Sequence, residues 1–313
     1  MRRNPRGAVT PFAAAAPGTT IPRGPADVRW TDADGVPRAG ADRGRAARAR
    51  LGLFVLLAYA LTWAWLLPLA LSDALVEQGR GWPTHFPALL GPLLAALVVA
   101  SRTGGLRGLL SRTVRVRIGL RWWAVALAPL GLLAIGLLVT GLTGGALPRY
   151  ADFGVISGLP AAWGPGFVVL VVVLVNGFGE ETGWRGYALT ALQRRFGPLT
   201  AMLLLAVIWA GWHAPMFLVL GSFRDFGPAV TAGWLLGLAA GSIVLGWLAN
   251  RTGSVPVVAV WHGLFTVVSG SAAATGTLAA VVSAGVMVWA VLLVGLELVA
   301  RRRGRPPVLG PRP

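Results

Sequence analysis

Long apolar stretches separated by short polar segments make up most of the chain after residue 50. A helix needs about 20 mostly apolar residues to cross the hydrocarbon core of a bilayer. Eight stretches reach or approach that length, at 51–72, 85–101, 122–142, 164–182, 199–220, 228–249, 254–270 and 277–299. The second and the seventh are short, so seven spans is the main alternative. The pattern predicts an all-α, polytopic membrane bundle of about eight transmembrane helices.

The positions of the arginines predict which way this bundle faces. Basic residues gather in cytoplasmic loops of membrane proteins. With eight spans and a cytoplasmic N-terminus, 25 of the 28 basic residues lie on the cytoplasmic side, and only Arg80, Arg149 and Arg224 lie outside. We therefore expect a multi-pass protein of the cell membrane with both termini in the cytoplasm. The net charge of +17 then reflects topology, and no nucleic-acid partner is expected.

Composition divides the chain into three parts. Residues 1–48 are rich in Arg, Pro, Gly and Ala without apolar periodicity, which predicts a disordered cytoplasmic arm. Residues 49–300 form the predicted transmembrane domain, and residues 301–313 a basic cytoplasmic tail. The basic run 107–121 alternates partly like a strand and partly like an interfacial helix, and we expect it along the cytoplasmic membrane surface.

Ionisable groups at membrane depth are costly and therefore indicate function. Outside loops and tails these residues are Glu180, Glu181, His213, His262 and Glu297. Glu297 lies one turn before Arg301, which favours a structural i,i+4 ion pair. The third histidine, His85, is expected at the surface as an interfacial residue. Cysteine is absent, which excludes thiolate nucleophiles and thiolate metal ligands.

The two adjacent glutamates cannot share one role. Successive residues of a helix point about 100° apart. Glu181 lies one turn before Arg185, in the orientation that favours an ion pair. Glu180 is then free to face another helix and act as a general base. A charge cluster at the end of a helix is the alternative interpretation.

The two intramembrane histidines each have a neighbour one turn away on the same helix face. Trp209 precedes His213 by four residues and is placed to pack beneath the imidazole, while Thr266 follows His262 by four. Pro215 is expected to kink the fifth stretch. A lone histidine in a membrane can simply join helices by hydrogen bonds. One carboxylate and two histidines on separate helices favour a catalytic site in the cytoplasmic half or near the midplane.

Three motifs in order resemble those of a known family. They are Glu180-Glu181-Thr-Gly-Trp-Arg185, Trp209-x-x-x-His213 and His262-x-x-x-Thr266. The chain resembles, over about residues 50–300, the CPBP family of intramembrane proteases, relatives of the type II CAAX prenyl endopeptidases and of bacteriocin-processing, immunity and abortive-infection proteins.

The resemblance implies an intramembrane endopeptidase. Glu180 would activate a water together with His213, and His262 with residue 266 would stabilise the oxyanion. Glu181 and Arg185 would support the site.

Two positions depart from the family pattern. Position 266 is usually Asn, whose amide N–H could bind the oxyanion, whereas Thr266 offers only a shorter hydroxyl. Trp209 replaces the commoner Phe, which we expect to be harmless.

The sequence leaves the role of a metal open. Glu180, His213 and His262 form a two-His, one-carboxylate set that suits a zinc ion, and the same groups can act without metal. No His-Glu-x-x-His or Gly-x-Ser-x-Gly run is present, which disfavours zincin and serine-hydrolase chemistry.

Two other functions stay open. One is a catalytically silent membrane scaffold, such as a bacteriocin-immunity or sensor protein of the same fold. The other, less favoured, is a proton-coupled transporter. Gly233, Gly237 and Gly241 favour a close helix-packing face over a transport repeat. The expected substrate is a membrane-associated peptide or protein, while the sequence defines neither its prenylation nor the oligomeric state.

Overall fold

The computed structural model describes residues 39–311, with side chains from residue 44 onward. The chain divides into two compact units, residues 1–46 and 47–313. Most of the predicted disordered arm therefore lies outside the described residues. Helix α1 spans Ala39–Leu71, so it begins before residue 49, where we placed the start of the transmembrane domain.

The described chain is helical, with isolated bridges but no strands between residues 39 and 311. After α1 the elements are η1 Phe86–Leu90, α2 Gly91–Arg102, α3 Leu106–Thr113, α4 Leu120–Ala126, α5 Ala128–Leu142, η2 Tyr150–Gly154, η3 Ala161–Trp163, α6 Gly164–Val171, η4 Val172–Gly177, α7 Phe178–Gly183, η5 Trp184–Ala188, α8 Leu189–Gln193, α9 Pro198–Trp212, α10 Met216–Val219, α11 Gly221–Arg224, α12 Pro228–Thr252, α13 Val255–Gly270 and α14 Gly276–Arg302.

Several helices are long and apolar enough to cross a membrane. In the described residues there are 5 such helices, or up to 6 if α4 and α5, which are bent by 46°, form one span. Phe86–Arg102 and Val255–Gly270 are shorter apolar helices. All eight predicted stretches coincide with helices, and the all-α membrane bundle is confirmed. The count of eight and the cytoplasmic termini stay predictions.

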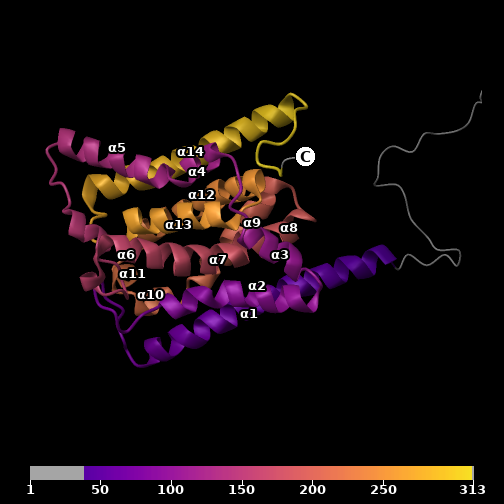
Figure 1. Ribbon diagram of the computed structural model, residues 1–313, viewed down its shortest axis with the longest axis horizontal. Coiled ribbons are helices and arrows are strands. Elements are labelled where there is room, and N and C mark those ends of the chain that lie inside the picture. The colour runs from indigo at the N-terminus through magenta and orange to yellow at the C-terminus, as the bar shows by residue number, and fades with distance from the viewer. Residues whose placement is uncertain (1–38, 312–313) are drawn as a thin grey trace, which may run out of the picture. The chain divides into compact units, whose positions relative to one another are not determined.

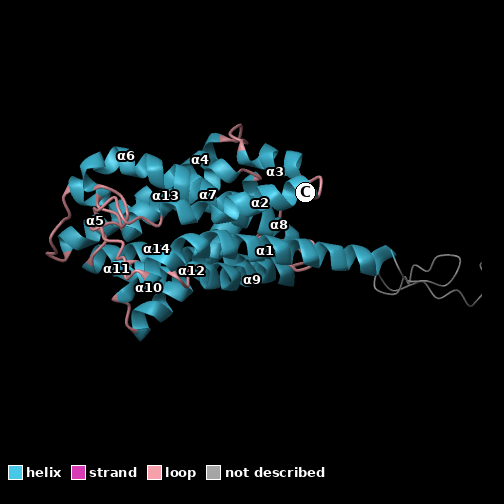
Figure 2. Cartoon of the chain, turned by 90° about the horizontal axis from the view of Figure 1, so that it is seen from below, coloured by secondary structure: helices cyan, strands magenta, loops and turns pink. Residues whose placement is uncertain are grey.

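The helices of residues 47–311 lie side by side (Figure 1). Helix α13 packs against η4 and α7, α2 packs against α7, and α12 packs between α9 and α14. Figure 2 shows loops mainly at the ends of the helices. Helices α3 and α8 and the C-terminal end of the chain lie together at one end of the bundle (Figure 1). This end brings together the arginine-rich segments that we predicted to be cytoplasmic.

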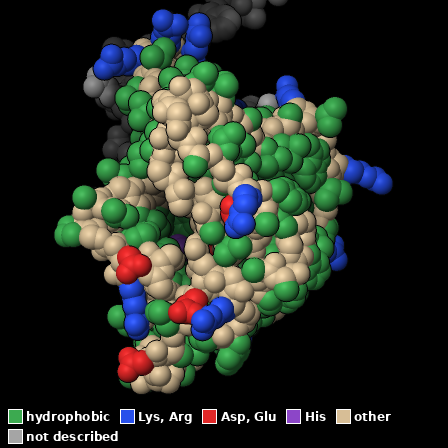
Figure 3. Space-filling model, turned by 90° about the vertical axis from the view of Figure 1, so that its left-hand side faces the viewer, with side chains coloured by type: hydrophobic (Ala, Val, Ile, Leu, Met, Phe, Trp, Pro, Cys, Tyr) green, Lys and Arg blue, Asp and Glu red, His purple; other side chains and the backbone are tan. Residues whose placement is uncertain are grey.

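The opposite end carries exposed ion pairs in its loops. Arg80 lies 2.8 Å from Glu77, and Arg149 lies 3.0 Å from Asp152. Figure 3 views this end, where acidic side chains lie beside arginines. His85 also lies in the loop between α1 and η1, but it is only 9% exposed and packs on the ring of Phe86. The expectation that His85 is a surface residue was wrong, because the loop folds over it.

Glycines allow α7 and its neighbours to pack closely against other helices. A Cβ at Gly177 would overlap the carbonyl oxygen of Ala259 in α13, and one at Gly183 would lie 2.5 Å from Pro92 Cβ in α2. Larger side chains would force these helices apart. The predicted packing face of α12 was wrong, because a Cβ at Gly233 or Gly241 would meet nothing within 4 Å. Gly233 and Gly241 therefore do not bring a helix close, whereas the glycines around α7 do.

Two π-helical turns flank α7. They are η4, Val172–Gly177, and η5, Trp184–Ala188. Such wider turns occur mostly as single insertions and are frequent at functional sites. They interrupt the 3.6-residue periodicity, so which residues of this segment share a face cannot be counted from ordinary helical spacing.

The basic C-terminal segment folds back onto the bundle. Leu309 is fully buried, and its N–H donates to Glu297 Oε2 at 2.9 Å. Asn250 Nδ2 donates to the Leu309 carbonyl at 2.7 Å, and Arg251 donates to the carbonyl before it. Glu297 also accepts from Arg301 Nε at 2.7 Å, so the predicted structural ion pair is confirmed.

Candidate active site

The carboxylate of Glu180 is held by two hydrogen-bond donors from different helices. Glu180 lies on α7 and is 2% exposed. Asn176 Nδ2 donates to Oε1 at 2.5 Å, and Trp209 Nε1 donates to Oε2 at 2.7 Å. Each oxygen keeps a further lone pair that can accept a proton from water. The two donors therefore fix the carboxylate in place and leave it able to act as a base.

Glu181 forms a buried ion pair and also contacts a histidine. Its Oε1 lies 2.9 Å from Arg185 Nη1, and both side chains are fully buried. The predicted Glu181–Arg185 pair is confirmed. The same oxygen lies 2.7 Å from His262 Nδ1. Glu181 thus holds the catalytic candidate His262 as well as Arg185, a link that the sequence did not reveal.

Trp209 contacts Glu180, both histidines and Arg185. Its indole N–H donates to Glu180, and its ring meets that of His262 edge-on at 5.5 Å between centroids. Its ring centroid is 5.6 Å from that of His213, and the guanidinium of Arg185 lies 4.4 Å from it. Phenylalanine could make the ring contacts but not the hydrogen bond. Trp209 is therefore more than the harmless replacement that we expected from the sequence.

His213 lies where the fifth predicted span is interrupted. Helix α9 ends at Trp212 and α10 begins at Met216, with Pro215 in the turn between them. His213 Nδ1 lies 2.7 Å from the Trp209 carbonyl oxygen. Because a carbonyl can only accept, Nδ1 carries the proton, and Nε2 of the neutral ring carries the lone pair. His213 is therefore oriented as a proton acceptor at Nε2.

The hydroxyl of Thr266 is engaged with a residue that sequence reasoning missed. Thr266 Oγ1 donates to Asn176 Oδ1 at 2.8 Å. Since a threonine has a single hydroxyl proton, this contact competes with donation to an oxyanion. Asn176 is 6% exposed and lies one turn before Glu180. Its signal in the sequence was a lone amide within an apolar stretch, which a search for ionisable groups passes over.

The arrangement does not form the zinc set that the sequence left open. Across residues 44–311 no hydrogen bond joins Glu180 to either histidine. The described chain contains no group of three His, Cys, Asp or Glu side chains placed to hold a metal ion. Both Glu180 oxygens instead face N–H donors, and His262 Nδ1 faces Glu181.

Comparison with known proteins shows what this region is similar to. Residues 162–268 match the family model described as type II CAAX prenyl endopeptidase Rce1-like, and this range contains every predicted site residue. The match supports the resemblance to the CPBP family. CAAX prenyl protease 2 of Methanococcus maripaludis is 32% identical to it over 102 residues. That match covers 31% of this chain and 37% of the relative, so the chain spans about a third of the relative's length.

The match to the Rce1-like family model runs from η3, just before α6, into the second half of α13. It therefore includes the π-helical turns around α7 and the break after α9. Helices α1 to α5 and α14 lie outside it.

Proposed function

We propose that this protein is an intramembrane endopeptidase that hydrolyses a peptide bond in a membrane-associated protein or peptide. The observation that carries the proposal is the Glu180 carboxylate, held by Asn176 and by Trp209, whose ring contacts the rings of both histidines. The family match supports a protease.

In the proposed reaction, Glu180 takes a proton from water while the water oxygen attacks the carbonyl carbon of the scissile bond. The second O–H of the water donates a hydrogen bond to His213 Nε2, which keeps the water oriented. The attack forms a tetrahedral oxyanion. The proton on Glu180 then passes to the leaving nitrogen as the C–N bond breaks, which leaves a carboxylic acid and an amine. The water oxygen and one hydrogen end in the new carboxylic acid, and the other hydrogen ends on the amine, so no further reactant is needed.

His262 is the proposed oxyanion donor. Glu181 lies against its Nδ1. An N–H of the ring would donate to the developing negative charge, and one such donor is worth roughly 3–4 kcal/mol in the transition state. Arg185 contacts the same oxygen of Glu181 and holds the carboxylate in place.

Thr266 is proposed to act through Asn176 instead of touching the oxyanion. Its hydroxyl holds the Asn176 carbonyl oxygen, so the Asn176 amide nitrogen faces Glu180. The resemblance implied a direct role for position 266. Thr266 and Asn176 are therefore proposed as positioning residues for the base.

We also propose that the site opens toward the cytoplasmic side. His262 lies two turns after Val255, where α13 begins. Ser254, just before that helix, donates to the Arg115 carbonyl in the arginine-rich segment after α3. The positive-inside rule places this segment in the cytoplasm.

A silent scaffold of the same fold is the second candidate. Its support is the Thr266 hydroxyl, which is engaged with Asn176. A scaffold would need neither the base nor the oxyanion donor, so loss of either would leave its function intact.

The proposal is tested with the full chain purified in nanodiscs. Cleavage of candidate membrane peptides, with and without a prenyl group, is measured for wild type, Glu180→Gln and His262→Ala. We expect each variant to lose about 10²-fold or more of the activity. Thr182→Val is the matched control, because Thr182 adjoins Glu181 but its hydroxyl makes no hydrogen bond to any described residue. Equal turnover by all four proteins would overturn the endopeptidase proposal and favour the scaffold.

A further inference from the structure

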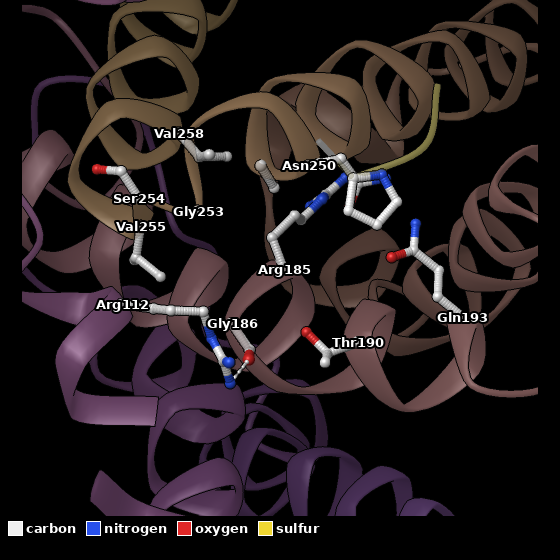
Figure 4. Close-up of a pocket in the computed structure, with 12 residues that line it drawn as sticks. Arg112, Arg185, Gly186, Thr190, Gln193, Asn250, Gly253, Ser254, Val255 and Val258 are labelled. Carbon is white, nitrogen blue, oxygen red and sulfur yellow. Dashed lines mark hydrogen bonds between the residues drawn. The ribbon is translucent and has the colours of Figure 1, made fainter. Parts of the chain in front are cut away.

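A pocket of about 190 Å³ lies at the arginine-rich end of the bundle and shares Arg185 with the proposed catalytic site. Figure 4 shows it between α3, the η5–α8 segment, the end of α12 and the start of α13. Its polar lining includes Arg112, Arg185, Thr190, Gln193 and Asn250. A second pocket of about 110 Å³ shares Arg112 and Thr190 with it and adds Arg50 and Arg194. Neither pocket is lined by an Asp or Glu residue.

Three residues that line the first pocket carry buried side-chain nitrogens without a hydrogen-bond partner in the described chain. Arg185 is 3% exposed and uses Nη1 for Glu181, which leaves Nε and Nη2 without a partner. Arg112 donates from Nη2 to the Gly186 carbonyl at 2.8 Å, and its Nε has no hydrogen-bond partner. Gln193 Nε2 also has no hydrogen-bond partner. Buried donors without acceptors are costly, so this cluster calls for an acceptor from outside the chain.

The charges around the pocket point to an anion. Burial lowers the pKa of Arg112, and the positive charge of Arg194 lowers it further. Topology explains exposed arginines such as Arg107, but it does not explain why Arg185 and Arg112 turn inward around a polar pocket. A negative ligand would compensate the repulsion and satisfy the free donors together.

We propose that this pocket binds a phosphate group through Arg112, Arg185 and Gln193, supplied by an anionic lipid headgroup or by soluble phosphate. Three side chains carry four nitrogen atoms without a hydrogen-bond partner, which suits an anion with several oxygens better than a carboxylate with two. Arginine pairs with phosphate oxygens through two parallel hydrogen bonds. The pocket lies where the helices end, which is the depth at which basic pockets between transmembrane helices bind lipid headgroups.

The test measures thermal unfolding of the full chain in nanodiscs of neutral phosphatidylcholine. Inorganic phosphate is added against chloride at matched ionic strength, and a second series replaces part of the lipid with phosphatidic acid. A ligand that binds only the folded state raises the unfolding temperature in proportion to its occupancy. A shift with inorganic phosphate identifies a soluble source, and a shift only with phosphatidic acid identifies a lipid. Either result supports the proposal. It is overturned if the unfolding temperature shifts in neither series.

Variants decide whether the pocket itself is the site. Arg112→Gln is expected to weaken the apparent affinity by roughly tenfold or more, because it removes a charged donor. Gln193→Leu removes one donor without changing charge, so it should reduce the ligand-induced shift. Arg107→Gln is the matched control, since Arg107 lies on the same helix, is exposed and lines neither pocket.

Equal losses in Arg107→Gln and Arg112→Gln would show general charge attraction and overturn the proposal. The proposal would also be overturned if Gln193→Leu and Arg112→Gln each kept the ligand-induced rise in unfolding temperature that the wild type shows. The readout is stability, so it does not depend on whether the protein cleaves peptides.

Discussion

The side chain of Asn176 joins Glu180 to Thr266. Its amide nitrogen donates to the Glu180 carboxylate, and its carbonyl oxygen accepts the Thr266 hydroxyl proton. The base on α7 and the third motif on α13 are thereby connected through one residue of η4.

Removal of Asn176 should impair catalysis more than substrate binding. Asn176→Ala takes one donor from the base, and we expect kcat to fall about tenfold to a hundredfold while KM changes little. Thr266→Val should cause a smaller loss, because it frees Asn176 without removing it. The double variant should be no worse than Asn176→Ala, since coupled residues are not additive. If the losses in kcat of the two single variants add up in the double variant, Thr266 acts independently of Asn176, as a direct donor to the oxyanion would.

Trp209→Phe separates the hydrogen bond of Trp209 from its packing. The ring contacts to the histidines are kept, while the N–H donated to Glu180 is lost. We expect activity to fall about tenfold or more, since a hydrogen bond to a charged group contributes about 1.5–3 kcal/mol. Trp234→Phe is the control, because Trp234 packs on His213 through its ring. Similar activity in Trp209→Phe and wild type would contradict the assigned role.

Glu181→Gln should destabilise the fold. It leaves the fully buried Arg185 without its ionic partner, and breaking a buried pair in this way costs about 3–5 kcal/mol. The double variant Glu181→Gln with Arg185→Met should recover part of that loss, because it removes the uncompensated charge. Denaturant titration in mixed micelles measures both. A double variant less stable than the single one would show that the pair does not behave as a unit.

Gly177→Ala should disrupt the packing of η4 on α13. A Cβ there overlaps the Ala259 carbonyl, so we expect a lower unfolding temperature and lower activity. Gly233→Ala adds the same group to α12 in open space, and it should be neutral or stabilising by about 0.5–1 kcal/mol. Thermal unfolding of both proteins compares them directly. Equal destabilisation would mean that close approach is not the reason for Gly177.

The absence of cysteine makes the topology easy to test. Single cysteines at two exposed sites, Ser111→Cys in α3 and Ser72→Cys after α1, are labelled in intact cells with a maleimide that does not cross membranes. We expect Ser72→Cys to react and Ser111→Cys to react only after lysis. The reverse pattern would invert the predicted orientation. Ala214→Cys, beside His213 and also exposed, then reports which side has access to the site.

Features that depend on local spacing could be predicted from the sequence. The Glu181–Arg185 and Glu297–Arg301 pairs follow from i,i+4 geometry, and both are present. The helical stretches follow from hydropathy. The gathering of Glu180, His213 and His262 around Trp209 was expected only as convergence of helices, because spacing says nothing about which side chain lies between them.

Features that depend on tertiary contacts could not be predicted. Asn176 joins the site through a π-helical turn, which ordinary helical spacing does not anticipate. The burial of His85 depends on how a loop folds. Gly233 and Gly241 of α12 have the right spacing for a packing face, yet a Cβ at either position would meet nothing within 4 Å. The contact between Glu181 and His262 joins residues far apart in the chain.

The backfolded C-terminal segment has a practical consequence for handling the protein. Leu309 fills a buried position, and its N–H is held by Glu297. Cutting the chain before residue 305 would expose an apolar surface and leave the Glu297 carboxylate short of a donor. A purification handle is therefore better fused to the N-terminal end, and shortened versions of the protein should keep these last residues.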